Sequence, residues 1–222
     1  MEAHDLYRTA RQQLVDLCRG LRDDEASRPV PACPGWAVKD VAAHVTGIAV
    51  DVLGGNLEGL GTDAWTARQV DSRRGRSLSE VLDEYVALGG ALDELAATNP
   101  ASALRMGRDV TVHEQDIRAA LACPGNRSTD SIFAVCKSYA AGFVERVEAA
   151  ALPAVAVEVD GSTVGSSGAT VVVSGNSFEL LHTLTGRRSR RQAEALEWNG
   201  NHPAHVALMP TYGDFQILDV AE

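Results

Sequence analysis

The period of the apolar residues changes once along this chain of 222 residues, close to Pro153, and this change constrains the fold more than any other feature. Before Pro153, apolar residues recur every three or four positions, which is the period of an amphipathic helix. After it, "AVAVEVDG" alternates like a strand, and "SSGATVVVSGN" reads as a strand between two turns. The sequence therefore predicts an α+β protein, with a helical bundle over residues 1–152 and a small α/β domain over 153–222.

Five helices are predicted before this boundary. They are expected near residues 6–21, 41–52, 77–98, 105–121 and 130–152. The third begins at Ser77, because Glu80 follows it at the spacing of a capping box. In the smaller domain, "SFELLHTLTG" predicts a short helix and "DFQIL" a last strand.

Composition and charge argue against several classes of partner. The net charge is −10, and the only dense basic run is "GRRSRR", so the electrostatic footprint of a nucleic-acid-binding protein is missing. No apolar run approaches the roughly 18 to 20 residues that span a bilayer. The N-terminus, "MEAHDLYRTARQQL", is charged and unlike a signal peptide. We expect a cytoplasmic protein with no nucleic-acid or membrane partner.

The four cysteines are expected to be reduced, because they form no C-x-x-C pair and no secretory signal precedes them. Cys18 and Cys136 lie on helical stripes and are expected to be buried. Cys33 and Cys123 each precede a proline in a loop, and their chemistry stays open. Lysine is rare beside arginine, a bias typical of a GC-rich genome such as an actinobacterial one.

Three polar side chains lie on apolar helical stripes, where a core residue is expected. Asp109 and His113 are one helical turn apart, and His44 lies between Val41 and Val45. If these two helices face each other, two imidazoles and a carboxylate converge and leave a coordination position open. That ligand set is typical of a catalytic metal site, and zinc fits it best, although iron, nickel and manganese are also compatible. Asp116 is placed to orient the imidazole of His113.

The same residues also fit an interpretation without metal. A histidine on an apolar face is more often a hydrogen-bonded core residue than a ligand, and a buried carboxylate requires some partner. The alternative arginine partners are Arg105 or Arg108 for Asp109, and Arg118 or Arg146 for Asp116.

Three segments carry a family resemblance. "PGWAVKDVAAHV" (34–45) and "RDVTVHEQDIRAAL" (108–121) resemble the signature segments of the mycothiol-dependent maleylpyruvate isomerase family, which belongs to the DinB-like four-helix bundle superfamily. "SFELLHTLTGRR" (177–188) resembles a segment of that family's smaller C-terminal domain. The resemblance covers essentially the whole chain, and it implies an N-terminal DinB-like four-helix bundle followed by a small C-terminal α/β domain.

The resemblance also implies a metal held in the bundle by a histidine of the first segment and by a glutamate and a histidine four residues apart. His44 and His113 match the two histidines. Asp109 stands where the family has glutamate, which shortens the side chain by about 1.5 Å, one carbon–carbon bond. Aspartate can still ligate zinc. The family relates its C-terminal domain to thiol binding and catalysis through an arginine, and Arg187 is the matching position.

The expected activity is that of a metal-dependent enzyme that uses mycothiol. A divalent cation lowers the pKa of a bound thiol, and the thiolate then adds to a small electrophile. Arg187 or Arg188 would hold a carboxylate of the cofactor or substrate by paired hydrogen bonds. A transferase is favoured over an isomerase, because the sequence identifies no dedicated pocket for maleylpyruvate.

Two other functions remain open at this point. The aspartate could weaken or empty the metal site and leave a ligand-binding or regulatory protein. Alternatively, the metal could activate water for hydrolysis, with Asp116 as the general base. The sequence predicts no oligomeric state.

Overall fold

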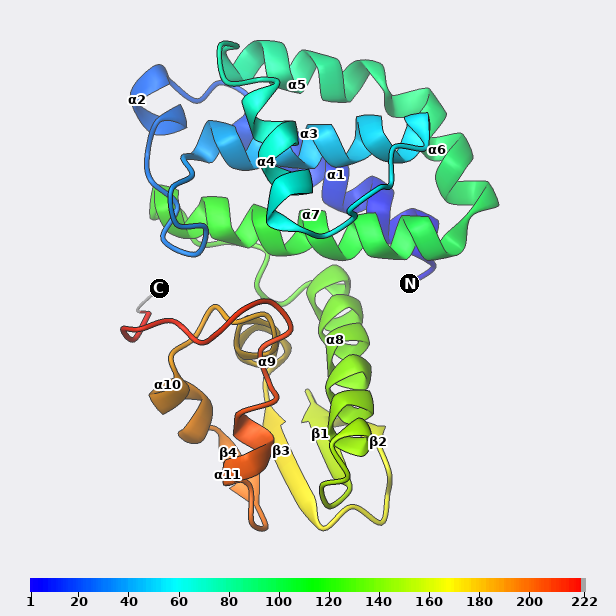
Figure 1. Ribbon diagram of the computed structural model, residues 1–222, viewed down its shortest axis with the longest axis vertical. Coiled ribbons are helices and arrows are strands. Elements are labelled where there is room, and N and C mark those ends of the chain that lie inside the picture. Colours follow the sequence, from blue (N-terminus) through cyan, green and yellow to red (C-terminus); the bar gives the residue numbers. More distant parts are fainter. Residues whose placement is uncertain (221–222) are drawn as a thin grey trace. The chain divides into compact units, whose positions relative to one another are not determined.

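The computed structural model describes residues 1–220 and divides the chain into two compact units, Met1–Gly125 and Asn126–Glu222 (Figure 1). The first unit contains α1 (Ala3–Cys18), α2 (Asp23–Ala26), α3 (Val38–Gly54), α4 (Asp63–Asp71), α5 (Leu78–Ala87), α6 (Gly89–Thr98) and α7 (Pro100–Leu121). The second contains α8 (Asp130–Ala149), β1 (Val155–Val159), β2 (Ser162–Gly165), β3 (Val171–Gly175), α9 (Ser177–Leu184), α10 (Arg190–Glu194), β4 (Glu197–Asn199) and α11 (Pro203–Val206). The predicted α+β class is confirmed.

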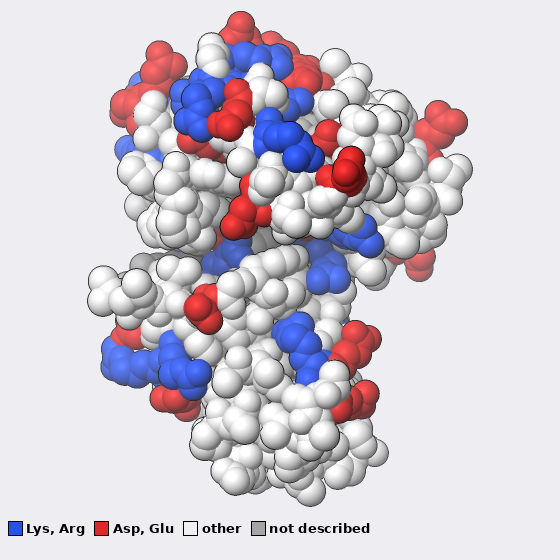
Figure 2. Space-filling model, in the orientation of Figure 1, with Lys and Arg blue, Asp and Glu red and all other residues white. Residues whose placement is uncertain are grey.

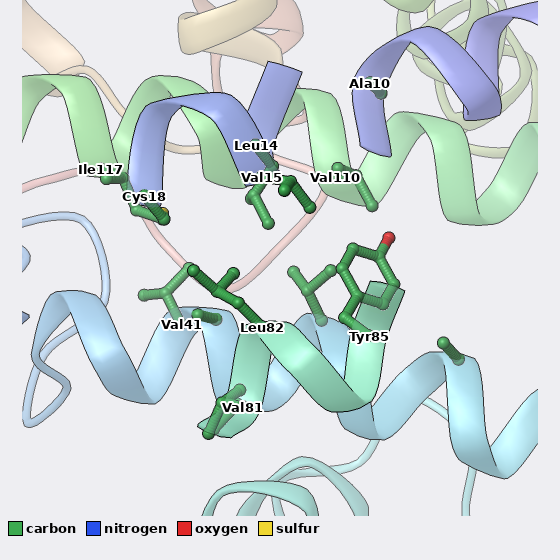
Figure 3. Close-up of a cluster of buried hydrophobic side chains, with 14 of the residues drawn as sticks. Ala10, Leu14, Val15, Cys18, Val41, Val81, Leu82, Tyr85, Val110 and Ile117 are labelled. Carbon is green, nitrogen blue, oxygen red and sulfur yellow. The ribbon is translucent and has the colours of Figure 1, made fainter. Parts of the chain in front are cut away.

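The first unit is a helical bundle built from α1, α3, the consecutive helices α5 and α6, and α7. Helix α1 packs along α7, and α3 packs on α4, α5 and α7. Figure 3 shows Leu14 and Val15 of α1 with Val110 and Ile117 of α7, facing side chains of α3 and α5. Leu14 and Ile117 have no exposed surface. Burying one side chain of this size contributes about 1.5–3 kcal/mol relative to leaving it in water.

The boundaries of two predicted helices differ from the structure. The third is interrupted near Leu88, just before Gly89 and Gly90, and continues as α6. Its start is as predicted, since the hydroxyl of Ser77 accepts from the Glu80 amide and the Glu80 carboxylate accepts from the Ser77 amide. Helix α7 begins at Pro100 rather than at 105, because the Asn99 side chain caps its first turn.

The boundary between the units lies at 125/126 and not at the predicted 152/153. Helix α8 packs against α9, β1 and β2, and so belongs to the same unit as the sheet. An amphipathic stripe shows that a helix has a buried face, but does not identify the element that covers it.

The sheet of the second unit has the order β2-β1-β3-β4. Strands β1 and β3 are parallel, with Val157 paired to Val173, and the two outer strands are antiparallel to their neighbours. The β1–β2 hairpin turns at Asp160 and Gly161, which both have positive φ, as a two-residue hairpin loop requires. The strand expected at "DFQIL" is absent from the described part of the chain, where Gln216 forms only an isolated bridge with Ser189.

The surface carries both signs of charge. On the face drawn in Figure 2, lysine and arginine are interspersed with aspartate and glutamate over the elements of each unit. Within residues 1–220, none of the helices combines the length and the apolar character that crossing a membrane requires.

Candidate metal centre

Helices α3 and α7 bring His44, Asp109 and His113 together inside the first unit. Helix α3 starts at Val38, three residues before the predicted 41, and the Asp40 carboxylate accepts from the Ala37 amide at 2.9 Å in its first turn. The Nε2 atom of His44 lies 3.9 Å from Oδ2 of Asp109, and Nε2 of His113 lies 3.7 Å from Oδ1. The two imidazole rings meet edge to face, with centroids 5.2 Å apart. One ligand atom from each side chain can be chosen so that all three lie within 4.8 Å of one another.

The ring of His44 is oriented by a chain of two hydrogen bonds. Nε2 of Gln69, from α4, donates to the Asp51 carboxylate at 2.7 Å. This contact fixes the Gln69 amide, so that its Oε1 faces Nδ1 of His44 at 2.8 Å and can only accept. His44 therefore carries its ring proton on Nδ1. The lone pair of Nε2 is directed towards Asp109.

The ring of His113 is oriented in the same way by a carboxylate. Its Nδ1 donates to Oδ2 of Asp116 at 2.9 Å. Asp116 is almost fully buried, with a side chain 1% exposed. Partners of this kind fix the tautomer of a metal-binding histidine. This contact is the one anticipated for Asp116 from its spacing along the helix.

The Asp109 carboxylate has an unsatisfied oxygen that a cation would complete. Oδ2 is buried and accepts no hydrogen bond. Among the described residues, Asp109 forms no ion pair with Arg105 or Arg108, and its charged contacts are the two histidines. Burying such a group without a partner is costly. Two imidazole nitrogens and one carboxylate are also a ligand set that zinc accepts, so the residues fit a divalent cation.

The pKa values of the two histidines diverge. Burial lowers the pKa of His44 to about 4, against the opposing influence of Asp109, so this ring is neutral near pH 7. Burial also disfavours the charged form of His113, but Asp109 and Asp116 outweigh that effect and raise its pKa well above the ordinary value. The negative charge of Asp109, which favours a proton on the His113 ring, also favours a cation bound beside that ring.

A glycine allows α4 to approach α3 closely enough for this arrangement. A Cβ atom at Gly47 would lie 2.4 Å from Cβ of Gln69, closer than two side chains can pack. Gln69 is itself 3% exposed, so it has little room to retreat. The close approach at Gly47 therefore places the Gln69 amide against His44.

The predicted arginines lie in the second unit, after α9. Nη1 of half-buried Arg187 donates to the Thr185 carbonyl at 2.7 Å. Arg188 is buried and donates from Nε and Nη2 to both carboxylate oxygens of Glu179, at 2.9 and 3.0 Å. Of the arginines proposed to pair with Asp116, Arg118 donates to Glu114 at 2.6 Å instead.

Three further residues at the site were not predicted from the sequence, namely Gln69, Asp51 and Cys33, whose chemistry had stayed open. Gln69 follows Trp65 by one helical turn, and that spacing was a usable signal of an inward-facing amide. The Sγ atom of Cys33 lies 3.7 Å from Oδ2 of Asp116. No spacing rule could have brought it there, because the loop before α3 determines its position.

Comparisons with known proteins support the family resemblance. A family model described as the mycothiol maleylpyruvate isomerase N-terminal domain matches residues 7–118. A crystal structure of mycothiol-dependent maleylpyruvate isomerase with a histidine-to-alanine substitution has a TM-score of 0.61 at 11% identity, covering 88% of this chain and 91% of that one. A further crystal structure of mycothiol-dependent maleylpyruvate isomerase has a TM-score of 0.53 at 12% identity, covering 83% and 88%.

At such identities the structural likeness establishes the fold alone. No curated protein matched the chain. The family model spans half of the sequence and includes all three residues of the candidate metal centre. The chain therefore belongs to the mycothiol maleylpyruvate isomerase N-terminal domain family.

Proposed function

We propose that this protein is a divalent-metal-dependent enzyme that adds the thiol of mycothiol to a small electrophile, as a transferase or an isomerase. The observation that carries the proposal is that Nε2 of His44 and Nε2 of His113 converge on the Asp109 carboxylate, whose buried Oδ2 has no hydrogen-bond partner. Family membership supports mycothiol as the cosubstrate, because the matching family is described by that thiol. Zinc is the proposed metal, since it accepts nitrogen and oxygen ligands in open sites.

His44, Asp109 and His113 would hold the metal, and their neighbours would keep them in place. A divalent cation bound there would lower the pKa of a thiol and supply a nucleophile at neutral pH. Gln69 and Asp116 hold the two rings with Nε2 directed inwards. In this role Asp116 orients an imidazole. Its hydrogen bond to His113 gives no support to the role of a general base for hydrolysis.

Arg187 and Arg188 are proposed to serve the thiol or the substrate through their guanidinium groups. Arg188 already binds Glu179 with two of its nitrogens, which favours a structural role for that residue. Arg187 is the stronger proposal for recognition of a carboxylate, by the paired hydrogen bonds that arginine forms.

The sequence favoured a transferase, whereas the proteins matched by structure are named isomerases. Both reactions begin with sulfur adding to an electrophilic carbon. In a transferase the new carbon–sulfur bond remains. In an isomerase the thiol adds to a conjugated double bond, the carbon–carbon bond rotates, and the thiol leaves again. The same metal centre supports both outcomes.

The test is thiol-dependent turnover by the full-length protein, with metal removed and then restored. Consumption of mycothiol with an activated electrophile, and isomerisation of maleylpyruvate, should both be assayed. We expect activity that is lost on metal removal, restored by zinc, and lost in His44→Ala. The matched control is His4→Ala, because His4 is an exposed histidine outside the centre. Arg187→Ala should raise KM, whereas exposed Arg190→Ala should not.

Other outcomes of these assays would indicate a different function. Turnover that needs metal but no thiol would identify a hydrolase. Metal binding without turnover of any electrophile would favour a ligand-binding or regulatory protein. Full activity in His44→Ala would contradict the proposed centre.

A further inference from the structure

A second group of possible cation ligands lies on the opposite edge of the His113 ring. It consists of Sγ of Cys33, Nδ1 of His113 and Oδ2 of Asp116. The three atoms are separated by 3.9 Å (Sγ to Nδ1), 3.7 Å (Sγ to Oδ2) and 2.9 Å (Nδ1 to Oδ2). The first centre uses Nε2 of the same ring, so the two groups share His113 through different nitrogens.

These separations are close to those of a tetrahedral site. With ordinary zinc bond lengths to sulfur, nitrogen and oxygen, neighbouring ligand atoms lie about 3.3 to 3.6 Å apart. Each observed separation differs from that range by less than about 0.5 Å, which side-chain rotation can supply. His113 and Asp116 are buried, and Cys33 is half-buried.

The Cys33 loop is held in place by backbone contacts. The Cys33 amide donates to the Val30 carbonyl and the Cys33 carbonyl accepts from the Trp36 amide, each at 3.0 Å. Pro29 and Ala37 close the loop as an isolated bridge. The thiol is therefore directed at the His113–Asp116 pair by an ordered loop.

The other cysteines have no such surroundings. Burial raises the pKa of Cys18 and of Cys136 to about 12, which suits inert core thiols. Cys123 is half-buried, like Cys33, but it belongs to neither of the two possible ligand groups found among the described residues. Cys123 is therefore a matched internal control.

We infer that Cys33, His113 and Asp116 form a second binding site, selective for a thiophilic divalent cation such as zinc or cadmium, which competes with the first centre for His113. The Cys33 thiolate favours soft cations, whereas the first centre offers only nitrogen and oxygen ligands. On binding, the thiol proton of Cys33 and the Nδ1 proton of the cationic His113 ring both go to solvent, and the remaining ring proton resides on Nε2, facing Oδ1 of Asp109. One neutral imidazole then serves one cation at a time. Binding at this site needs neither mycothiol nor His44.

The test uses the full-length chain without a polyhistidine tag, stripped of metal, in the His44→Ala background that disables the first centre. Alkylation of each cysteine by iodoacetamide is followed by mass spectrometry with and without cadmium. Cadmium at about ten times its dissociation constant should slow alkylation of Cys33 about tenfold. Alkylation of Cys123 should be unchanged, and the further substitution His113→Ala should abolish the protection.

Cobalt gives a second readout, because a thiolate ligand produces a sulfur-to-cobalt charge-transfer band. The band should appear in His44→Ala and be lost when Cys33→Ser is added. The Cys33→Ser variant alone should still take up metal through the first centre. Failure of the second-site inference is therefore distinguishable from failure of the proposed function. Asp109→Asn, which removes another ligand of the first centre and leaves Cys33, His113 and Asp116 in place, replaces His44→Ala if circular dichroism shows that the latter is unfolded. Absence of the band, or equal protection with and without His113, would overturn the inference.

Discussion

At the scale of single residues, the proposed metal centre depends on hydrogen bonds that orient the two imidazole rings as much as on the proposed ligands themselves. Both imidazoles direct Nε2 inwards because an oxygen holds each Nδ1 proton. Helical periodicity predicted that His44, Asp109 and His113 share a region, since all three lie on apolar stripes. It could not predict which nitrogen would be free, because the oxygen that holds His44 comes from a separate helix.

The role of Gln69 gives the first prediction. Gln69→Leu removes the acceptor that fixes the His44 ring, so metal affinity should fall about 10- to 100-fold, as is usual when such a partner is lost. Competition with a fluorescent zinc chelator measures the affinity. Nitrogen NMR should also show that the ring proton of His44 is no longer confined to Nδ1. Gln12→Leu, at an exposed position of α1, is the control and should leave both measurements unchanged. Unaltered affinity in Gln69→Leu would refute this role.

At the scale of helices and strands, most elements followed from periodicity and capping, whereas their packing partners did not. The helix over 130–152 is present as α8 (Asp130–Ala149), but it belongs to the second unit, where it packs against α9, β1 and β2. The predicted helix over 77–98 is split because Gly89 and Gly90 follow Leu88. Glycine loses more conformational freedom in a helix than alanine does, so the chain breaks there at little cost.

The contact between α3 and α4 gives the second prediction. Gly47→Ala places a methyl group against Gln69, which should destabilise the protein by about 1–3 kcal/mol through overpacking. It should also weaken metal binding, because α4 must move away from His44. Gly90→Ala is the matched helical control, with no atom within 4 Å of the added methyl group. That change should stabilise the protein by about 0.5–1 kcal/mol. Chemical denaturation measures the free energy of unfolding of both variants. Equal changes in Gly47→Ala and Gly90→Ala would contradict the proposed close contact between α3 and α4.

The third prediction concerns pH and an ion pair between Arg73, in the segment between α4 and α5, and Glu84 of α5. Arg73 is 8% exposed and binds both oxygens of Glu84. Burial disfavours ionised Glu84, but Arg73 and Arg76 outweigh it and lower its pKa. The pair therefore stabilises the protein fully above the unfolded pKa of about 4.3, and this contribution is lost as the pH falls through the lower folded value.

Glu84→Gln should accordingly cost about 1–3 kcal/mol in the free energy of unfolding at pH 7, since it leaves a buried guanidinium without its charged partner. The difference from the wild type should shrink as the pH falls through the folded pKa. Urea titrations at a series of pH values test this. A difference that stays constant down to acidic pH would show that the ion pair is not its source.

At the scale of the whole molecule, the two-unit organisation was predictable but its boundary was not. The change in apolar period marks where strands begin, whereas the units separate one helix earlier, at 125/126. All three proposed ligands of the first metal centre lie in the Met1–Gly125 unit.

This location gives the fourth prediction. A fragment of residues 1–125 should fold as a helical domain and bind metal, because it contains the bundle core and every proposed ligand. Extending it to residue 152 should add helix without raising its thermal midpoint, since α8 packs on elements that the longer fragment lacks. Circular dichroism and metal titration test both fragments. An unfolded 1–125 fragment, rescued by residues 126–152, would favour the boundary predicted from the sequence.

The metal content of the purified full-length protein tests the central claim most directly. The protein should be prepared without a polyhistidine tag or chelator and analysed by plasma mass spectrometry, beside His44→Ala, His113→Ala and the exposed control His4→Ala. The account predicts about one equivalent of a divalent metal, chiefly zinc, in the wild type and the control, as an open three-ligand site holds. It predicts strongly reduced metal in the two site variants. No bound metal in the wild type, and none taken up when zinc is supplied, would contradict it.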